Sequence, residues 1–333
     1  MHSRISIPEN PLARLHSIYE ALEQDRRWWR SSVRLRYAAM AAICTEGSPA
    51  SVAGGIRNMD MSVKEASPWN MDVGSHIRFI VGSILYQNGD SGKSFIKEVE
   101  RVRKMFRTEK LHRALRMEMM AVLVLRIQAG GGTISRQTVR RFHEIYDEMK
   151  QHHRWLTGPD DFPACAILTG QEGTPRAIGQ KTEEIYSELR TLKFPSGNPL
   201  QTAANLLFLA DGTPQQLAEK MAHLKAEFRG RKVRISQLNF DELAILAFLK
   251  QPAERVVADV VANREELKTV RPRFDAGTLF NAAVAVTFVK MFGTSVDTVS
   301  LNRAKTVIDI QAVIAAQQAA AMAGAAAAAA AAT

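Results

Sequence analysis

The chain has 333 residues, of which 46% are hydrophobic and 23% are charged, and this composition excludes an intrinsically disordered protein. Aromatic residues make up only 7%, with 20 Gly and 12 Pro, which argues against an all-β fold and favours a helical one. The formal net charge is +10, and there are two cysteines. Cys44 and Cys165 lie too far apart for a disulfide framework or a cysteine metal site.

The positive charge is concentrated in the N-terminal half. Residues 1–156 hold 25 Lys and Arg and 16 Asp and Glu, so they account for +9 of the total, and residues 157–333 account for +1. Such an asymmetry indicates an anionic partner. The N-terminus has no apolar segment of the kind found in secretory signals. Residues 1–300 contain no run of about 18 strongly apolar residues, so we expect a cytoplasmic protein without membrane insertion.

The first elements in chain order are an amphipathic helix in LARLHSIYEALEQ and a more apolar helix in LRYAAMAAIC. Between them, DRRWWRSSVRLRY combines Arg26, Arg27 and Arg30 with two Trp. Arginines beside aromatic rings suit phosphates and stacked bases. The alternative is a hairpin turn in which a Trp packs inward and arginine stems cover the first helices.

The next hairpin opens with EGSPASVAGGI, residues 46–56. Gly ends the preceding helix, Ser48 caps the next helix, and Pro49 fits its first turn. After the apolar segment IRFIVGSILYQ comes NGDSGKS, residues 88–94. It lacks the spacing of a phosphate loop, because only two residues separate its two glycines. We interpret Asp90 or Ser91 as a helix cap.

A strongly basic helix follows, within residues 93–116. The basic side chains that we expect to form a stripe across neighbouring hairpins, where they would follow a phosphate backbone, are Lys97, Arg101, Arg103, Lys104, Arg107, Arg136, Arg140 and Arg141. The alternative is a solvated face whose charges are paired in salt bridges. Further along, EMKQHHRWLTGPDDFPACA holds His, Asp and Cys residues. Helix capping explains this segment better than a metal or acid–base site.

The chain then repeats one phrase, QEGTPRAIGQKT and ADGTPQQLAEKM, with Thr174 and Thr213 separated by 39 residues. Both threonines are expected to be N-caps, followed by the first-turn prolines Pro175 and Pro214. This spacing extends in both directions. It predicts an all-α fold, an α-solenoid-like superhelix of about seven helical hairpins with a roughly 40-residue period over residues 11–292. An irregular helical bundle is the alternative.

The end of the chain differs from the hairpins. Residues 293–322 are expected to form a C-terminal helix with an apolar side. Residues 323–333 are almost pure Ala, so this Ala-rich tail has high helix propensity but little to bury, and we expect it to fray.

The serial hairpins EIYDEMKQHHRWLTGPDDFPACAILTG and EIYSELRTLKFPSGNPLQTAANLLFLADGTP, with the close VIAAQQAAAMAGAAAA, resemble the bacterial domain of unknown function 4003. The resemblance covers about residues 15–325. It implies a soluble cytoplasmic protein, and it supplies no catalytic residues, because the family has no assigned activity.

The sequence supports three functional hypotheses. The leading one is a non-enzymatic, protein-binding scaffold or regulator, because stacked hairpins present an extended concave surface. The second is nucleic-acid binding through the basic N-terminal half. The third is an enzyme whose cleft is formed by distant helices, which leaves no linear motif. We expect no cofactor and no metal, and we assign no catalytic residue.

Overall fold

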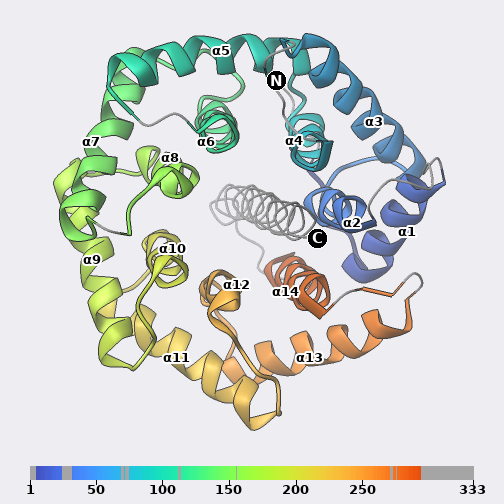
Figure 1. The fold of residues 1–333 in the computed structure, drawn as a ribbon. Helices are drawn as coiled ribbons and strands as arrows, with labels where there is room; N and C mark the ends of the chain where they lie inside the picture. Colours follow the sequence, from blue (N-terminus) through green and yellow to red (C-terminus); the bar gives the residue numbers. More distant parts are fainter. Residues whose placement is uncertain are drawn as a thin grey trace, which may run out of the picture. The chain divides into compact units, whose positions relative to one another are not determined.

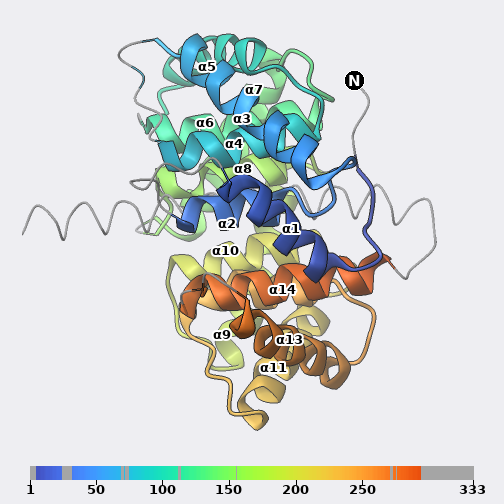
Figure 2. The same cartoon turned by 90° about the vertical axis from the view of Figure 1, so that its right-hand side faces the viewer.

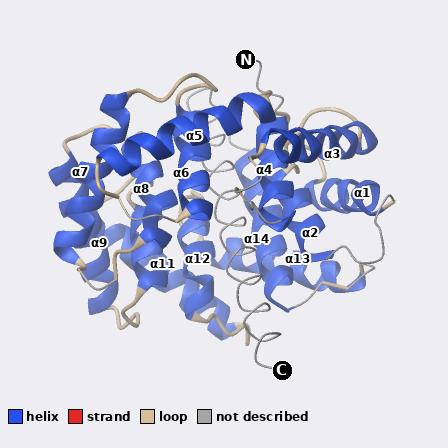
Figure 3. Cartoon of the chain, turned by 45° about the horizontal axis from the view of Figure 1, so that its top comes forward, coloured by secondary structure: helices blue, strands red, loops and turns tan. Residues whose placement is uncertain are grey.

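The computed structural model describes residues 5–24, 32–68, 71, 75–111, 114–154, 156–270, 273–274 and 276–293. Within these residues there are fourteen α-helices, two short 3-10 helices and no β-strand. Figure 3 shows the helices in blue, joined by loops and turns. The all-α class is therefore confirmed. In this part of the chain, no helix is long and apolar enough to cross a membrane.

From Pro49 onward, the helices alternate along the chain between a more polar helix and a more apolar one. Figure 1 labels all of the helices in chain order. Their bounds are α1 Pro11–Glu23, α2 Ser32–Ala41, α3 Pro49–Ala66, α4 Ser75–Gln87, α5 Gly92–Thr108, α6 Leu115–Gln128, α7 Arg136–His152, α8 Phe162–Thr169, α9 Pro175–Thr191, α10 Asn198–Leu207, α11 Pro214–Gly230, α12 Phe240–Leu246, α13 Ala253–Thr269 and α14 Ala276–Gly293. The short helices η1 (Pro159–Asp161) and η2 (Gln237–Asn239) precede α8 and α12.

The repeated acidic-Gly-hydroxyl-Pro phrase begins α3, α9 and α11. In each, the hydroxyl residue accepts a hydrogen bond from the backbone amide three residues later, and a proline occupies the first turn. The pairs are Ser48 with Ser51 (3.2 Å), Thr174 with Ala177 (3.2 Å) and Thr213 with Gln216 (3.3 Å). At Thr213 the Gln216 side chain also accepts from the Thr213 amide, so two otherwise unpaired donors are satisfied together.

The described residues group into two compact units. The first contains the described parts of Met1–Arg101, Ala129–Thr133 and Asn263–Thr333. Within it, α14 packs against both α1 and α2 (Figure 2). The Arg36 guanidinium donates to the Arg273 carbonyl, and the Asn281 amide lies 3.5 Å from the Tyr37 hydroxyl. The last helix pair therefore contacts the first, which the terminal repeats of an open solenoid do not do, and the expected solenoid is not confirmed.

The second unit contains Val102–Gln128 and Ile134–Ala262. Its apolar helices α6, α8, α10 and α12 pack on one another in chain order, and so do its amphipathic helices α7, α9 and α11. Phe106, Phe142 and Phe162 meet in its core with ring centroids 5.0 to 6.0 Å apart. Each hairpin thus buries its apolar face against the next one.

The expected C-terminal helix (293–322), apart from its first residue, and the Ala-rich tail (323–333) lie outside the described residues. Both cysteines are buried free thiols, as their apolar sequence surroundings indicate.

Candidate functional site

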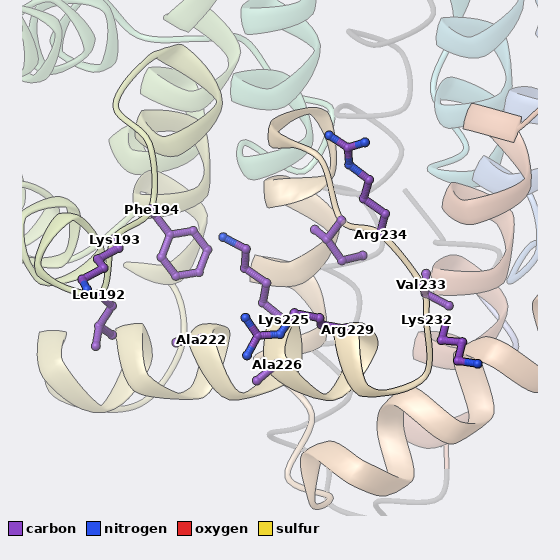
Figure 4. Close-up of a pocket in the computed structure, with 11 residues that line it drawn as sticks. Leu192, Lys193, Phe194, Ala222, Lys225, Ala226, Arg229, Lys232, Val233 and Arg234 are labelled. Atoms are coloured by element: carbon purple, nitrogen blue, oxygen red, sulfur yellow. The ribbon is translucent and has the colours of Figure 1, made fainter.

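Five basic side chains surround one pocket of about 580 Å³ in the second unit, between the end of α9 and the last turns of α11 (Figure 4). The lining consists of Leu192, Lys193, Phe194, Ala222, Lys225, Ala226, Arg229, Lys232, Val233, Arg234 and Ile235. The other lining residues are apolar, and no carboxylate is among them. The pocket therefore combines positive charge with an apolar wall.

The face of α11 explains how its part of the pocket forms. Ala222, Lys225, Ala226 and Arg229 occupy positions i, i+3, i+4 and i+7 of the helix, so they share one face of it. The two alanines leave room, and the two long basic side chains border it. In Figure 4, Lys225 reaches towards the Phe194 ring, and Arg229 lies beside it.

The two ends of the pocket are formed by matching helix terminations. Lys193 follows α9 with φ of 62°, and Lys232 follows α11 with φ of 59°. After each lysine, the next residue's amide bonds a carbonyl five residues back: Phe194 to Leu189 at 3.1 Å and Val233 to Phe228 at 2.9 Å. This is the Schellman termination, which usually places glycine at the left-handed position. Lysine there costs about 1–2 kcal/mol of backbone strain.

Lys225 is the most enclosed of the five cations. Its amino group lies 4.2 Å from the Phe194 ring centroid and 5.5 Å from that of Phe240. Partial burial, followed by the charge of Arg229, lowers the pKa of Lys225 from its ordinary value, whereas contact with the ring faces favours the ammonium form.

None of the five cations forms an ion pair with a carboxylate in the described part of the chain. Some basic side chains elsewhere are paired: Arg78 lies 2.7 Å from Asp60, and Lys268 lies 2.6 Å from Glu265. Like charges repel one another, so five basic side chains without a carboxylate partner raise the free energy of the unbound pocket. A bound anion would reduce this repulsion, which favours an anionic ligand.

The basic residues singled out in the sequence have several different roles. Arg101 pairs with Glu98 at 2.6 Å, and Arg103 pairs with the buried Glu118 at 2.5 Å. Arg141 stabilises the end of α8 and the turn after it. Its guanidinium donates hydrogen bonds to the carbonyls of Thr169, Gln171 and Gly173, at 3.0, 2.6 and 2.9 Å.

The remaining members of the expected basic stripe are exposed. They are Lys97, Lys104, Arg107, Arg136 and Arg140. Arg140 lies 4.0 Å from Glu109, a distance at the limit of an ion pair. Arg26, Arg27 and Arg30 lie outside the described residues. Three of the expected polyanion-binding residues are thus used within the protein itself.

The histidine and aspartate side chains that follow α7 have partners within the segment and on α9. His153 lies 2.7 Å from the Glu183 carboxylate and 4.3 Å from the Tyr186 ring centroid. Asp161 accepts a hydrogen bond from the Gly158 amide at 2.9 Å. These contacts fix the turn into η1 and agree with the capping interpretation.

A comparison with protein families decides the family of the chain. The model of the family described as "Protein of unknown function (DUF4003)" matches residues 18–319. The chain belongs to this family. The match confirms the resemblance seen in the serial hairpins.

A curated relative of this DUF4003 member is the uncharacterized protein YeaA of Bacillus subtilis (strain 168), which is 23% identical over 186 residues. That match covers 55% of this chain and 56% of the relative, so it spans about half of each protein. No solved structure matches the chain. The assignment of a site therefore depends on the geometry of this chain.

The excess of basic residues in the N-terminal half of this DUF4003 member does not indicate the pocket, which lies in the C-terminal half. The signal was the run KAEFRGRKVR, residues 225–234, where one Glu accompanies five basic residues. Phe194 could not be joined to that run from sequence, because most of a hairpin separates the two in the chain.

Proposed function

We propose that this protein acts by binding, as a scaffold or regulator, and that its α9–α11 pocket takes an organic anion. The observation that carries the proposal is the set of five basic side chains around one pocket without an ion-paired carboxylate. A bound anion would relieve their mutual repulsion. The lining contains no carboxylate, imidazole, hydroxyl or thiol, which supports binding over hydrolytic chemistry.

The composition of the pocket narrows the ligand class. Guanidinium groups such as those of Arg229 and Arg234 match phosphate or carboxylate oxygens with paired hydrogen bonds. Val233 and Ile235, which are partly exposed, offer an apolar surface for the body of the ligand. The volume of about 580 Å³ falls within the usual range for small-molecule sites, roughly 300–1,000 Å³. We therefore favour a small anion with an apolar or aromatic body.

Titration of the full chain with phenyl phosphate by isothermal calorimetry tests the proposal. Arg229→Ala should weaken binding about tenfold, the effect of losing one charge-assisted hydrogen bond. Arg231→Ala is the matched control: it removes the same charge two residues away, but Arg231 donates to the Glu254 carbonyl and does not line the pocket. Equal weakening by both changes, or no binding at low salt, would contradict the proposal.

Nucleic-acid binding through the exposed basic residues of α5 and α7 is the second candidate function, and a separate titration with a nucleic acid tests it. A single-stranded oligonucleotide would then bind with an affinity that falls steeply as salt rises. That affinity would be unchanged by Arg229→Ala and reduced by Lys104→Ala with Arg107→Ala.

A further inference from the structure

We propose that His223, Glu227 and Glu254 form a zinc site on the flank of α11 that faces α13. His223 and Glu227 are one turn apart on α11, and Glu254 lies in the first turn of α13. This site does not rest on the anion pocket, because none of the three residues lines it.

The two carboxylates converge on one nitrogen atom. The Nε2 atom of His223 lies 3.8 Å from Oε1 of Glu227 and 3.4 Å from Oε1 of Glu254. All three ligand atoms lie within 4.8 Å of one another. Two ligands bound to one tetrahedral zinc ion at about 2.0–2.1 Å are about 3.4 Å apart. The observed separations therefore need only small side-chain movements to surround an ion.

A second histidine shows what an ordinary ion-pair arrangement looks like in this protein. His143 also has two carboxylate neighbours, Asp147 one turn further on α7 and Glu109 from the preceding hairpin. There Glu109 faces Nδ1 at 3.9 Å and Asp147 faces Nε2 at 3.5 Å. Carboxylates on opposite edges of an imidazole cannot share one ion with it. At His223 a single Nε2 position faces both carboxylates.

The charge balance also differs between the two clusters. Glu109 has Arg140 as a further partner at 4.0 Å. In the described residues, neither Glu227 nor Glu254 has an ion pair with a lysine or arginine, and Arg231 reaches only the Glu254 carbonyl, at 3.4 Å. Two carboxylates held close together without a lysine or arginine, in a chain of net charge +10, are favourable for a bound cation.

The backbone around the cluster is held in place. Lys220 on α11 donates to the Leu249 carbonyl at 2.6 Å, and Arg231 donates to the Glu254 carbonyl. These bonds tie α11 to the segment after α12 and the residue after α11 to the first turn of α13. One imidazole and two carboxylates suit zinc better than calcium or magnesium, which prefer oxygen ligands alone. Three protein ligands leave one position for water or another molecule.

Zinc titration of the chelator-treated full chain tests the proposal, with magnesium as the comparison ion. We expect one zinc ion to bind, with affinity reduced about tenfold or more by His223→Ala and by Glu254→Gln. His143→Ala is the matched control and should leave zinc affinity unchanged. The melting temperature of the native chain, but not of His223→Ala, should rise with zinc. Equal zinc binding by the native chain and His223→Ala, or equal loss in the His143→Ala control, would overturn the site.

Discussion

The amino group of Lys225 lies 4.2 Å from the centre of the Phe194 ring, although the two residues belong to different hairpins. Phe194 is almost completely buried and stacks edge-on against Phe240 at 5.2 Å. Packing therefore fixes the position of the Phe194 ring, and the charged end of Lys225 lies over the apolar face of this ring. Through this contact, a positive charge and an aromatic ring lie side by side in the pocket lining.

Replacing Phe194 with Leu should weaken phenyl phosphate binding several-fold and leave inorganic phosphate binding nearly unchanged. Leu keeps most of the apolar volume, at a stability cost of about 1 kcal/mol, but removes the ring on which the phenyl group of the ligand would stack once Lys225 turns from the ring to the phosphate. Calorimetric titration with both ligands measures the difference. Phe208→Leu is the control, because Lys181 lies 5.1 Å from that ring outside the pocket. An equal loss for both ligands would contradict a role for the ring.

Lys193→Gly and Lys232→Gly should each stabilise the protein and weaken anion binding. Glycine adopts positive φ without the strain that lysine has there, and its greater freedom in the unfolded chain offsets part of the gain. We expect a net gain of up to about 1 kcal/mol in the free energy of unfolding, measured by urea denaturation. A lower free energy of unfolding in the Gly variants would show that the two lysine side chains stabilise the fold. Their presence at these positions would then be no evidence for a ligand.

Gly54 and Gly55 are neighbours in α3, and we expect replacement by Ala to have opposite effects on stability at the two positions. A Cβ on Gly55 would lie 2.1 Å from the Tyr86 ring of α4, whereas a Cβ on Gly54 meets nothing within 4 Å. Gly54→Ala should therefore stabilise the protein by about 0.5–1 kcal/mol. Gly55→Ala should destabilise it by about 1–2 kcal/mol, because the clash exceeds the gain in helix propensity. Thermal denaturation of the two variants tests this, and similar effects would contradict the close packing of α3 on α4.

Arg140 and Arg141 are also neighbours with different roles. Arg141→Ala should lower the free energy of unfolding by about 2 kcal/mol, because three carbonyls lose a charged donor. Arg140 is 72% exposed, so Arg140→Ala should change stability by less than about 0.5 kcal/mol. Denaturant unfolding of both variants measures these effects. Equal losses of unfolding free energy in the two variants would mean that the carbonyl contacts of Arg141 do not stabilise the fold.

This pair of arginines shows what sequence could and could not predict. The caps at Ser48, Thr174 and Thr213 depend on residues within one turn, so the local phrase was enough to predict them. The use of Arg141 depends on carbonyls about 30 residues away, and nothing in its own helix distinguishes it from Arg140. Charge counts identified the basic residues but not the carboxylates or carbonyls that they contact.

The same limit applies to the pocket. Its wall combines the termination of α9 with one face of α11, and the contact of α9 with α11 is what joins them. The roughly 40-residue spacing does relate Lys193 to Lys232, which are 39 residues apart. A sequence comparison between successive hairpin ends could have found these two lysines where glycine is usual, although not the ring and the arginines between them.

Asp161 gives the protein a distinctive dependence on pH. Burial in η1 beside α8, reinforced by the charge of Asp160, raises the pKa of Asp161 from 3.8 to about 6, while the Gly158 amide and His153 oppose the shift. The folded state therefore holds this proton more tightly than the unfolded chain. Below about pH 4 the carboxyl is neutral in both states. Between about pH 4 and 6 the unfolded state ionises first, so stability falls as pH rises, by about 3 kcal/mol in all.

Asp161→Asn should remove this contribution, because the amide stays neutral and its oxygen can still accept from Gly158. The free energy of unfolding of Asp161→Asn minus that of the native chain should therefore increase by about 2–3 kcal/mol between pH 4 and pH 7. Urea denaturation at several pH values measures this difference. Other titrating groups, including Glu183 with its lowered pKa, largely cancel, because both proteins contain them. Parallel stability curves for the two proteins would show that Asp161 ionises normally in the folded state.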